Sequence, residues 1–248
     1  MKLLNIGCGQ VYHPDWINLD LYRSKFVKYH NIKKTLPFED NSIDAIYHSH
    51  VLEHLTQEEG AKFLEDCYRV FKKGGVMRAV VPDLETICRE YIKNLENGYN
   101  ENEKEAIKHY QWNKMEMFDQ IIRQKPGGKM VEAIRGGTAD INYVVKRNGE
   151  EWISLFKKED SEFKKAARKL YYFLFNKNPQ NCGEAHKWMY DKLDLKLVLE
   201  SSGFKNFTLR KYNQSKIPNW ESYQLDTSKN SGLPRKPDSL YAEAEKDI

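Results

Sequence analysis

The first twenty residues place two short apolar runs on either side of a glycine-containing loop. Residues 2–6 (KLLNI) form the first run, which is followed directly by Gly7, Cys8 and Gly9. Residues 16–19 (WINL) form the second run, which ends at Asp20. Short apolar runs with such boundaries are typical of buried strands. We therefore predict two strands, with a glycine loop after the first and an acidic side chain at the end of the second.

This layout favours a nucleoside-binding site. Glycine lets the backbone turn sharply and lets a ligand approach it closely, and an acid at the end of the next strand can accept hydrogen bonds from ribose hydroxyls. The dinucleotide fingerprint G-x-G-x-x-G is not met, because Tyr12 stands at the third glycine position and no helix fits behind it. A pyrophosphate cradle of the kind that NAD enzymes use is therefore not expected.

The link between the two predicted strands is unusually short. It spans residues 7–15 and contains Pro14, whereas a parallel crossover normally needs a dozen residues or more. Two alternatives remain open at this point. Either a bare loop replaces the first helix of a parallel pair, or the two strands form a hairpin that turns at residues 13–15.

The next segments alternate between strand and helix patterns. Strands are predicted within residues 26–31, at 44–47 and at 77–81, and the last of them is closed by Pro82 and Asp83. Between the last two strands, Thr56 and Glu59 form a capping-box pattern at the start of a helix, which we expect to end at Gly74 and Gly75. This order predicts an α/β fold with a doubly wound sheet. Ligands bind such sheets at the carboxyl ends of the strands, where the pattern places Gly7, Gly9, Asp20, Asn31, His48, His50 and Asp83.

The pattern changes after Asp83. Helical periodicity dominates at residues 87–95, 103–122 and 162–175, with glycine pairs at 127–128 and 136–137. A helix at residues 193–202 and a strand at 207–212 then follow. We therefore divide the chain into a cofactor-binding half of the sheet (1–83), a mainly helical insertion (84–182) and a C-terminal part that completes the sheet (183–248).

Several segments, taken in order, resemble the class I S-adenosylmethionine-dependent methyltransferases. They are residues 4–9 (LNIGCG), Asp20, 36–38 (LPF), 44–47 (DAIY) and 52–54 (LEH). The resemblance covers about the first ninety residues and returns in the tail. It implies a Rossmann-like methyltransferase sheet with an insertion over the cofactor edge, and S-adenosyl-L-methionine as cofactor. The shortened opening is most similar to a small bacterial subgroup often encoded beside cell-surface polysaccharide genes.

The resemblance also implies which residues contact the cofactor. Asn31 stands near the position where the family has an acid for the adenine amine, although an ordinary turn asparagine explains it equally well. For His54, a structural role in the loop that shapes the cofactor site is favoured. The full predicted set is Asn5, Gly7, Cys8, Gly9, Asp20, Leu21, Asn31, His48, Ser49 and His54.

Methyl transfer to a hydroxyl benefits from a base that works near neutral pH, and histidine is the natural choice. We predict His50, Glu53 and His186 as catalytic residues, with Asp83 as a further carboxylate. For His186, a substrate contact and a surface position on the insertion remain alternatives. The acceptor class that we expect is a hydroxyl or an amine of a small or sugar-like molecule.

Two other functions compete with this hypothesis. His50, Glu53 and His54 match H-x-x-E-H, a zinc pattern of metallopeptidases in which two histidines share a metal and the glutamate is the general base. That function would leave the glycine loop and Asp20 unexplained. The second alternative is a catalytically silent module that binds the cofactor without transferring its methyl group.

Composition limits the partners and the compartment. The net charge of +4 is too small to predict nucleic-acid binding, and no run of eighteen apolar residues predicts a membrane span. Met1 leads straight into a strand, which leaves no room for a signal peptide. The four cysteines form no C-x-x-C pair. We therefore expect a cytoplasmic enzyme with reduced thiols and a small-molecule or glycan acceptor.

Overall fold

The computed structural model describes residues 1–125, 127–151, 153 and 185–247. The chain forms two compact units. Unit 1 contains residues 1–83, 187–234 and 239–248, and unit 2 contains residues 84–186 and 235–238. The helix predicted at residues 162–175 lies outside the described residues. Among the helices that are described, none is both long and apolar enough to cross a membrane.

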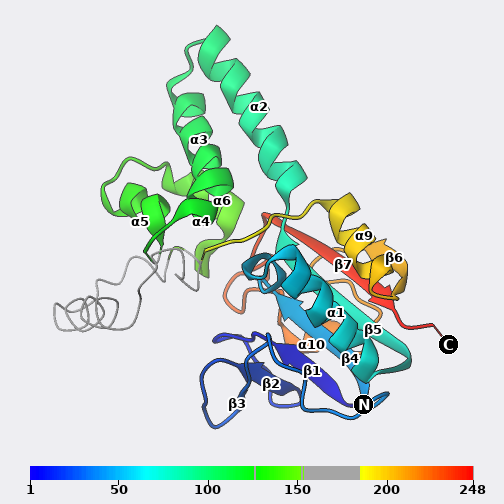
Figure 1. Cartoon of the computed structure of the whole chain (residues 1–248). Coiled ribbons are helices and arrows are strands. Elements are labelled where there is room, and N and C mark those ends of the chain that lie inside the picture. Colours follow the sequence, from blue (N-terminus) through cyan, green and yellow to red (C-terminus); the bar gives the residue numbers. More distant parts are fainter. Residues whose placement is uncertain (126, 152, 154–184, 248) are drawn as a thin grey trace. The chain divides into compact units, whose positions relative to one another are not determined.

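Unit 1 is built on a seven-stranded sheet (Figure 1). The strand order is β3-β2-β1-β4-β5-β7-β6. The first five strands in this order are parallel, and β7 is antiparallel to both β5 and β6. The predicted α/β class is therefore confirmed. The strands are β1 (Leu3–Ile6), β2 (Ile17–Asp20), β3 (Val27–Tyr29), β4 (Ile43–Ser49), β5 (Phe71–Pro82), β6 (Lys205–Leu209) and β7 (Ser239–Glu245).

Both faces of this sheet are buried. One face packs against helices α1 (Gln57–Val70) and α9 (Lys192–Ser201), which contribute Phe63, Leu64, Leu195 and Leu199 to a shared hydrophobic core. On the other face, Tyr47 of β4 and Tyr241 of β7 pack with Trp220 of the short helix α10 (Trp220–Tyr223) and with the loop residues Trp16, Ile217 and Leu225. Burial on both faces explains why the central parallel strands are rich in apolar residues, whereas the edge strand β3 is mostly exposed.

The short link between β1 and β2 is a bare loop within a parallel pair. Leu4 pairs with Ile17 and Ile6 with Leu19 in parallel register, so the hairpin alternative is wrong. Two buried asparagines hold the loop in place of a helix. The Asn5 amide donates to the Asn18 side chain at 3.1 Å and to the Val11 carbonyl at 3.0 Å. Asn18 in turn donates to the carbonyl oxygens of the loop residues His13 (3.0 Å) and Trp16 (2.8 Å).

The helix after Thr56 begins as predicted but ends early. The capping box between Thr56 and Glu59 is present. The helix does not continue to Gly74 and Gly75, because Phe71 is fully buried and already pairs with Ile43 as part of β5. The two glycines instead lie in an irregularity of β5, where Gly74 has φ +74° and its N–H donates to Lys246. Burial of Phe71 thus outweighs the helix-stop pattern.

Unit 2 is helical in its described residues. Its helices are α2 (Leu84–Asn100), α3 (Lys104–Lys114), the π-helical turn η2 (Met115–Asp119), α4 (Gln120–Ile122), α5 (Gly128–Arg135) and α6 (Ile141–Asn148). The predicted helix at 103–122 is thus a succession of α3, η2 and α4. A small core of Trp112, Met130, Ile134, Tyr143, Val144 and Ile153 holds the unit together.

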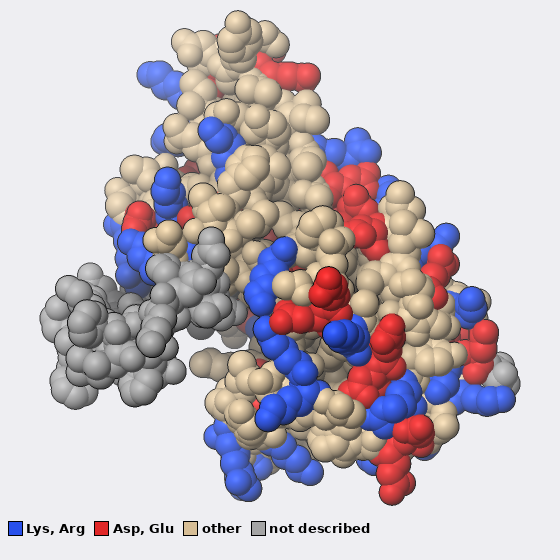
Figure 2. Space-filling view, viewed as in Figure 1, with Lys and Arg blue, Asp and Glu red and all other residues tan. Residues whose placement is uncertain are grey.

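Charged side chains of both signs are mixed on the face of unit 1 that carries α1 (Figure 2). Several are paired, including Lys33 with Glu59 (2.7 Å), Arg69 with Asp40 (2.7 Å) and Lys72 with Asp44 (2.9 Å). Exposed pairs of this kind contribute little stability each.

Candidate functional site

The glycine loop follows β1 directly, and two of its glycines have conformations that other residues rarely adopt. Gly7 has φ +65°, and a Cβ at this position would lie 2.4 Å from the Val51 side chain. Gly9 has φ +52°, and a Cβ there would meet no atom within 4 Å. Gly7 is therefore required by packing. At Gly9 the backbone borders open space, as a loop that receives a ligand requires.

Asp20 at the end of β2 is bonded to that loop. Its carboxylate accepts from the N–H of Gly9 at 2.8 Å and from the N–H of Leu21 at 2.6 Å. The Tyr22 hydroxyl donates to the Gly9 carbonyl and closes the same loop. An ionised carboxylate offers about four acceptor positions, so Asp20 keeps acceptor capacity for a diol. The arrangement fits the adenosine part of S-adenosylmethionine: Gly9 leaves space for a ligand, and Asp20 offers acceptors of the kind that ribose hydroxyls need.

Cys8 lies between the two glycines and is buried. Burial, together with the neighbouring Asp20 carboxylate, raises the pKa of the Cys8 thiol to about 12. The thiol therefore stays protonated at neutral pH and is a poor nucleophile. Cys8 contributes its backbone and its volume to the loop.

The other predicted cofactor residues take different positions. Leu21 is 64% exposed, and Ser49 is partly exposed at the end of β4. The side-chain oxygen of Asn31 accepts from the Lys33 N–H at 3.0 Å, which is the behaviour of a turn asparagine. Asn5 is buried, and its side-chain amide donates to the Val11 carbonyl in the loop. His48 is fully buried inside the sheet.

His48 faces α1 and packs edge-on against Phe63, with ring centroids 5.6 Å apart. Among the described residues, neither of its ring nitrogens has a hydrogen-bond partner. Burial disfavours the charged ring and lowers the pKa of His48 from 6.5 to about 4. His48 is therefore a neutral core residue of the folded protein at neutral pH.

This buried histidine makes stability sensitive to acid. Between pH 6.5 and pH 4 the unfolded chain binds a proton at His48 and the folded chain does not, so the free energy of unfolding falls as the pH falls. We expect His48 to account for a loss of about 3 kcal/mol across that window. Urea unfolding at several pH values should show a shallower acid dependence for His48→Leu than for the wild type. The same acid slope in His48→Leu would contradict this assignment, and His30→Ala, at a partly exposed histidine, is the control.

The segment after β4 carries the catalytic candidates. His50 has φ +55°, and its N–H donates to the Val80 carbonyl at 2.9 Å. Its Nδ1 lies 3.2 Å from Oε1 of Glu53, whose side chain is fully buried. The backbone N–H groups of Lys187 (2.7 Å) and Trp188 (3.3 Å) donate to the Glu53 carbonyl and fix that turn. A buried carboxylate beside an imidazole nitrogen orients the ring and stabilises its protonated form.

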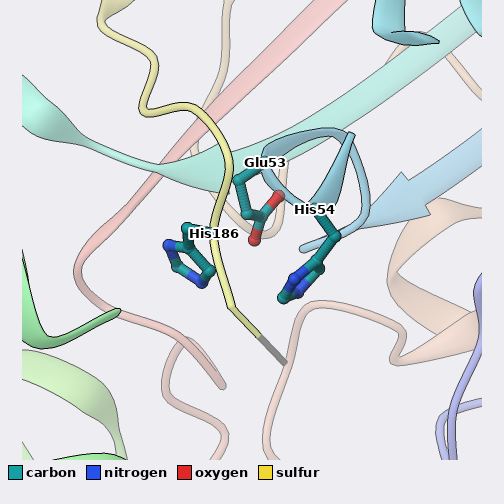
Figure 3. Close-up of side chains that lie close together, drawn as sticks. All are labelled: Glu53, His54 and His186. Carbon is teal, nitrogen blue, oxygen red and sulfur yellow. The ribbon is translucent and has the colours of Figure 1, made fainter. Parts of the chain in front are cut away.

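The zinc-peptidase hypothesis requires His50 and His54 on one α-helix, and this helix is not formed. His50 has left-handed backbone, and only a single 3-10 turn, η1 (Leu52–His54), follows it. Glu53 and His54 come from that turn and point to the same side of it (Figure 3), with ligand atoms within 4.8 Å of each other. The H-x-x-E-H match therefore lacks the helix that would place both histidines on one face to bind zinc.

His186 belongs to unit 2. Its side chain is buried rather than on the surface, and its backbone N–H donates to the Gln120 carbonyl at 2.8 Å. Its surface alternative is therefore wrong, and its predicted catalytic role stays a prediction. Asp83 follows β5 and forms an isolated parallel bridge with Tyr190.

Ser239 was not predicted from the sequence, and the structure places it beside His50. Its Oγ lies 2.8 Å from His50 Nε2. Ser239 is the first residue of β7, opposite Pro82 at the carboxyl end of β5. The two residues are 189 positions apart, and the sequence around Ser239 matches no functional motif. Only the position of β7 in the sheet brings it to this site.

Comparison with known families identifies part of unit 1. Residues 19–79 match a family model described as a methyltransferase domain. This segment of unit 1 is therefore similar to a methyltransferase domain. The matched range includes Asp20, His50 and Glu53, and it begins after the glycine loop. The predicted enzyme class, an S-adenosylmethionine-dependent methyltransferase, and the predicted cofactor are confirmed.

Three solved structures with some similarity to this chain come from Thermotoga maritima, Archaeoglobus fulgidus and Methanosarcina mazei. One from Thermotoga maritima, described as a possible histamine N-methyltransferase, is 13% identical with a TM-score of 0.45 and covers 99% of this chain and 82% of that one. An S-adenosylmethionine-dependent methyltransferase from Archaeoglobus fulgidus is 14% identical with a TM-score of 0.43, and the match covers 99% of this chain and 86% of that one. One from Methanosarcina mazei is 13% identical with a TM-score of 0.43, and the match covers 100% of this chain and 92% of that one. At these values the similarity says nothing of what the chain acts on. No curated protein sequence matches the chain significantly.

Proposed function

We propose that this methyltransferase transfers a methyl group from S-adenosylmethionine to a hydroxyl or amine of a small or sugar-like acceptor, with His50 as the base. The observation that carries the proposal is the arrangement along one edge of the sheet. The glycine loop and Asp20 end β1 and β2, and His50 with Glu53 follows β4 directly beside β1. Ligands of doubly wound sheets bind at this edge, where the strand order reverses.

The proposed roles follow from the chemistry of each group. Gly7 and Gly9 allow the backbone to approach the cofactor, and Asp20 holds its ribose. When bound, the cofactor supplies an electrophilic methyl group on a sulfonium. The chain must then hold an acceptor in line with that methyl group, and positioning of this kind can lower a barrier by roughly 7–11 kcal/mol. His50 takes the acceptor proton, and Glu53 keeps the ring oriented.

The sugar-like acceptor depends on the resemblance to the bacterial subgroup linked to polysaccharide genes. The shortened opening supports this part of the proposal, because the β1–β2 link is a bare loop braced by Asn5 and Asn18. The oligomeric state and the predicted cytoplasmic location are separate from this argument. A catalytically silent module would bind the cofactor equally well, and it is distinguished by the absence of methyl transfer to any acceptor.

Asp20 provides the test of the cofactor site. Asp20→Ala removes the hydrogen bonds from the N–H groups of Gly9 and Leu21 and the proposed ribose acceptor. A hydrogen bond to a charged group is worth about 1.5–3 kcal/mol. We expect the affinity for S-adenosylhomocysteine to fall at least about tenfold. Equilibrium binding to folded protein, verified by circular dichroism, measures the change.

The matched control is Asp15→Ala. Asp15 is in the same loop, and its side chain is 70% exposed; within the described part of the chain its ion-pair contact is with His13, at 3.8 Å. We expect this variant to bind S-adenosylhomocysteine like the wild type. Equal affinities for Asp20→Ala and the wild type would remove Asp20 from the cofactor site.

A further inference from the structure

His50 lies between a hydroxyl and a carboxylate. Ser239 Oγ is 2.8 Å from Nε2, and Glu53 Oε1 is 3.2 Å from Nδ1. The Glu53 side chain is fully buried, while 17% of the His50 side chain is exposed. The three groups therefore form a chain that runs from a buried carboxylate toward the partly exposed edge of the sheet.

The order of these groups determines which nitrogen of His50 can take a proton. The 3.2 Å contact between Nδ1 and Glu53 Oε1 is an ion-pair distance without hydrogen-bond alignment. A carboxylate has no proton to donate when ionised, so its negative charge beside Nδ1 favours the neutral ring that carries its proton on Nδ1. Nε2 then has a free lone pair and accepts from the Ser239 hydroxyl. When Nε2 becomes protonated, the buried Glu53 carboxylate stabilises the resulting positive charge.

The backbone holds this chain in place from three elements of unit 1. His50 is fixed after β4 by its N–H bond to Val80 of β5. Ser239 is fixed at the start of β7 by its pairing with Pro82. Glu53 is fixed on η1 by the bonds from Lys187 and Trp188. A site built on strand ends of the sheet is held more firmly than one on free loops.

We propose that Ser239, His50 and Glu53 form one proton-transfer chain, in which Ser239 is a positioning residue, and that the methyl acceptor is a hydroxyl. This inference rests on the proposed methyltransferase function and narrows its acceptor. Ser239 Oγ shows that an alcohol oxygen fits at hydrogen-bond distance from Nε2. An alcohol needs its proton removed as it attacks, whereas a neutral amine attacks through its lone pair and can lose a proton to solvent afterwards.

The transfer balances with these groups alone. The acceptor oxygen bonds to the methyl carbon as the carbon–sulfur bond breaks, and the sulfur keeps that electron pair and becomes a neutral thioether. For this step the acceptor hydroxyl takes the place of the Ser239 hydroxyl as the donor to His50 Nε2, and the acceptor proton goes to that nitrogen. The imidazolium beside Glu53 then releases this proton to solvent through its exposed edge.

The chain can be tested without any acceptor, by nitrogen-15 NMR of the histidines in the full-length protein, with His50 assigned through His50→Gln. In the wild type we expect His50 to be a single tautomer with a protonated Nδ1 and a bare Nε2. Ser239→Ala should shift the Nε2 resonance and leave Nδ1 protonated, and Glu53→Gln should mix the two tautomers. Ser201→Ala, an exposed serine of α9, is the control and should change neither resonance. A protonated Nε2 in the neutral wild-type ring, or no response of His50 to Ser239→Ala, would overturn the chain.

The acceptor class is tested with two matched probes, methyl α-glucoside and its 2-amino-2-deoxy analogue, each offered separately with S-adenosylmethionine labelled at the methyl group. We expect the glucoside to be labelled by the wild type and far less by His50→Ala. Exclusive labelling of the amino group overturns the hydroxyl assignment, and labelling of neither probe overturns it for simple hexosides. Binding of S-adenosylhomocysteine is measured on the same samples. If the protein binds it, either negative result concerns the acceptor; if the protein does not bind it, the proposed methyltransferase function fails.

Discussion

Replacing Arg78 by methionine is expected to lower the free energy of unfolding by about 3–5 kcal/mol, because it removes a fully buried cation that pairs with two buried carboxylates. Arg78 lies on β5 and is fully buried. Its guanidinium donates to Asp226 at 2.8 Å and to Glu243 at 3.2 Å, and both acids are almost completely buried. It also lies over the Trp220 ring, 4.5 Å from the ring centroid. One side chain therefore joins the sheet to the loops that cover one of its faces.

Three backbone carbonyls depend on the same guanidinium. It donates to Lys211 (3.1 Å), Tyr212 (3.1 Å) and Gln214 (2.8 Å), so Arg78→Lys should restore only part of the stability. Chemical denaturation measures the change. The control is Arg89→Met, whose arginine is 75% exposed and paired only with Glu85 in the described residues; we expect a change of less than about 1 kcal/mol there. A similarly small change for Arg78→Met would contradict the stabilising role proposed for Arg78 and its contacts with Asp226 and Glu243.

Replacing His50 by alanine is expected to lower the turnover number about 10²–10⁴-fold, which is the usual contribution of a general base. The affinity for S-adenosylhomocysteine should stay within about threefold, because His50 follows β4 while the ribose acceptor Asp20 ends β2. The measurement is the initial rate of methyl transfer to methyl α-glucoside, combined with a binding titration of the same preparation.

His30→Ala is the matched control for this prediction. His30 follows β3, and its Nε2 contacts the Lys34 carbonyl at 3.3 Å. Its removal should leave the turnover number unchanged. If His50→Ala and His30→Ala were equally active, His50 would not be the base. A fall in both turnover and cofactor affinity for His50→Ala would instead indicate a structural role for the ring.

The central strands of the sheet could be predicted because they are buried on both faces and therefore appear as apolar runs. Residues 2–6 and 16–19, together with Asp20, identified β1 and β2 and the acid that ends the second strand. The tail segment that completes the sheet is β7, paired between β5 and β6. The methyltransferase class followed from the same segments.

Local patterns failed where tertiary burial decided the outcome. Gly74 and Gly75 resemble a helix stop, but pairing of Phe71 with Ile43 begins β5 before them. The H-x-x-E-H match predicts two ligands on one helix, but β4 runs to Ser49 and leaves His50 in a left-handed conformation. Neither constraint is visible in a short window of sequence.

The candidate site could be predicted only in part. His50 and Glu53 were identified because they are close in sequence and follow a strand. Ser239 was missed because 189 positions separate it from His50 and only the order of β5 and β7 brings them together. The burial of His48 was missed as well, since a histidine at the end of an apolar run looks the same whether it faces a ligand or the core.

The most direct test of the account is calorimetric titration of the wild-type protein with S-adenosylhomocysteine. This product is stable and carries the same adenosine and amino-acid groups as the cofactor. We predict that one molecule of S-adenosylhomocysteine binds to each chain with a dissociation constant in the micromolar range. Absence of binding to a sample shown to be folded would contradict the cofactor site at the glycine loop and Asp20, and the methyltransferase function with it.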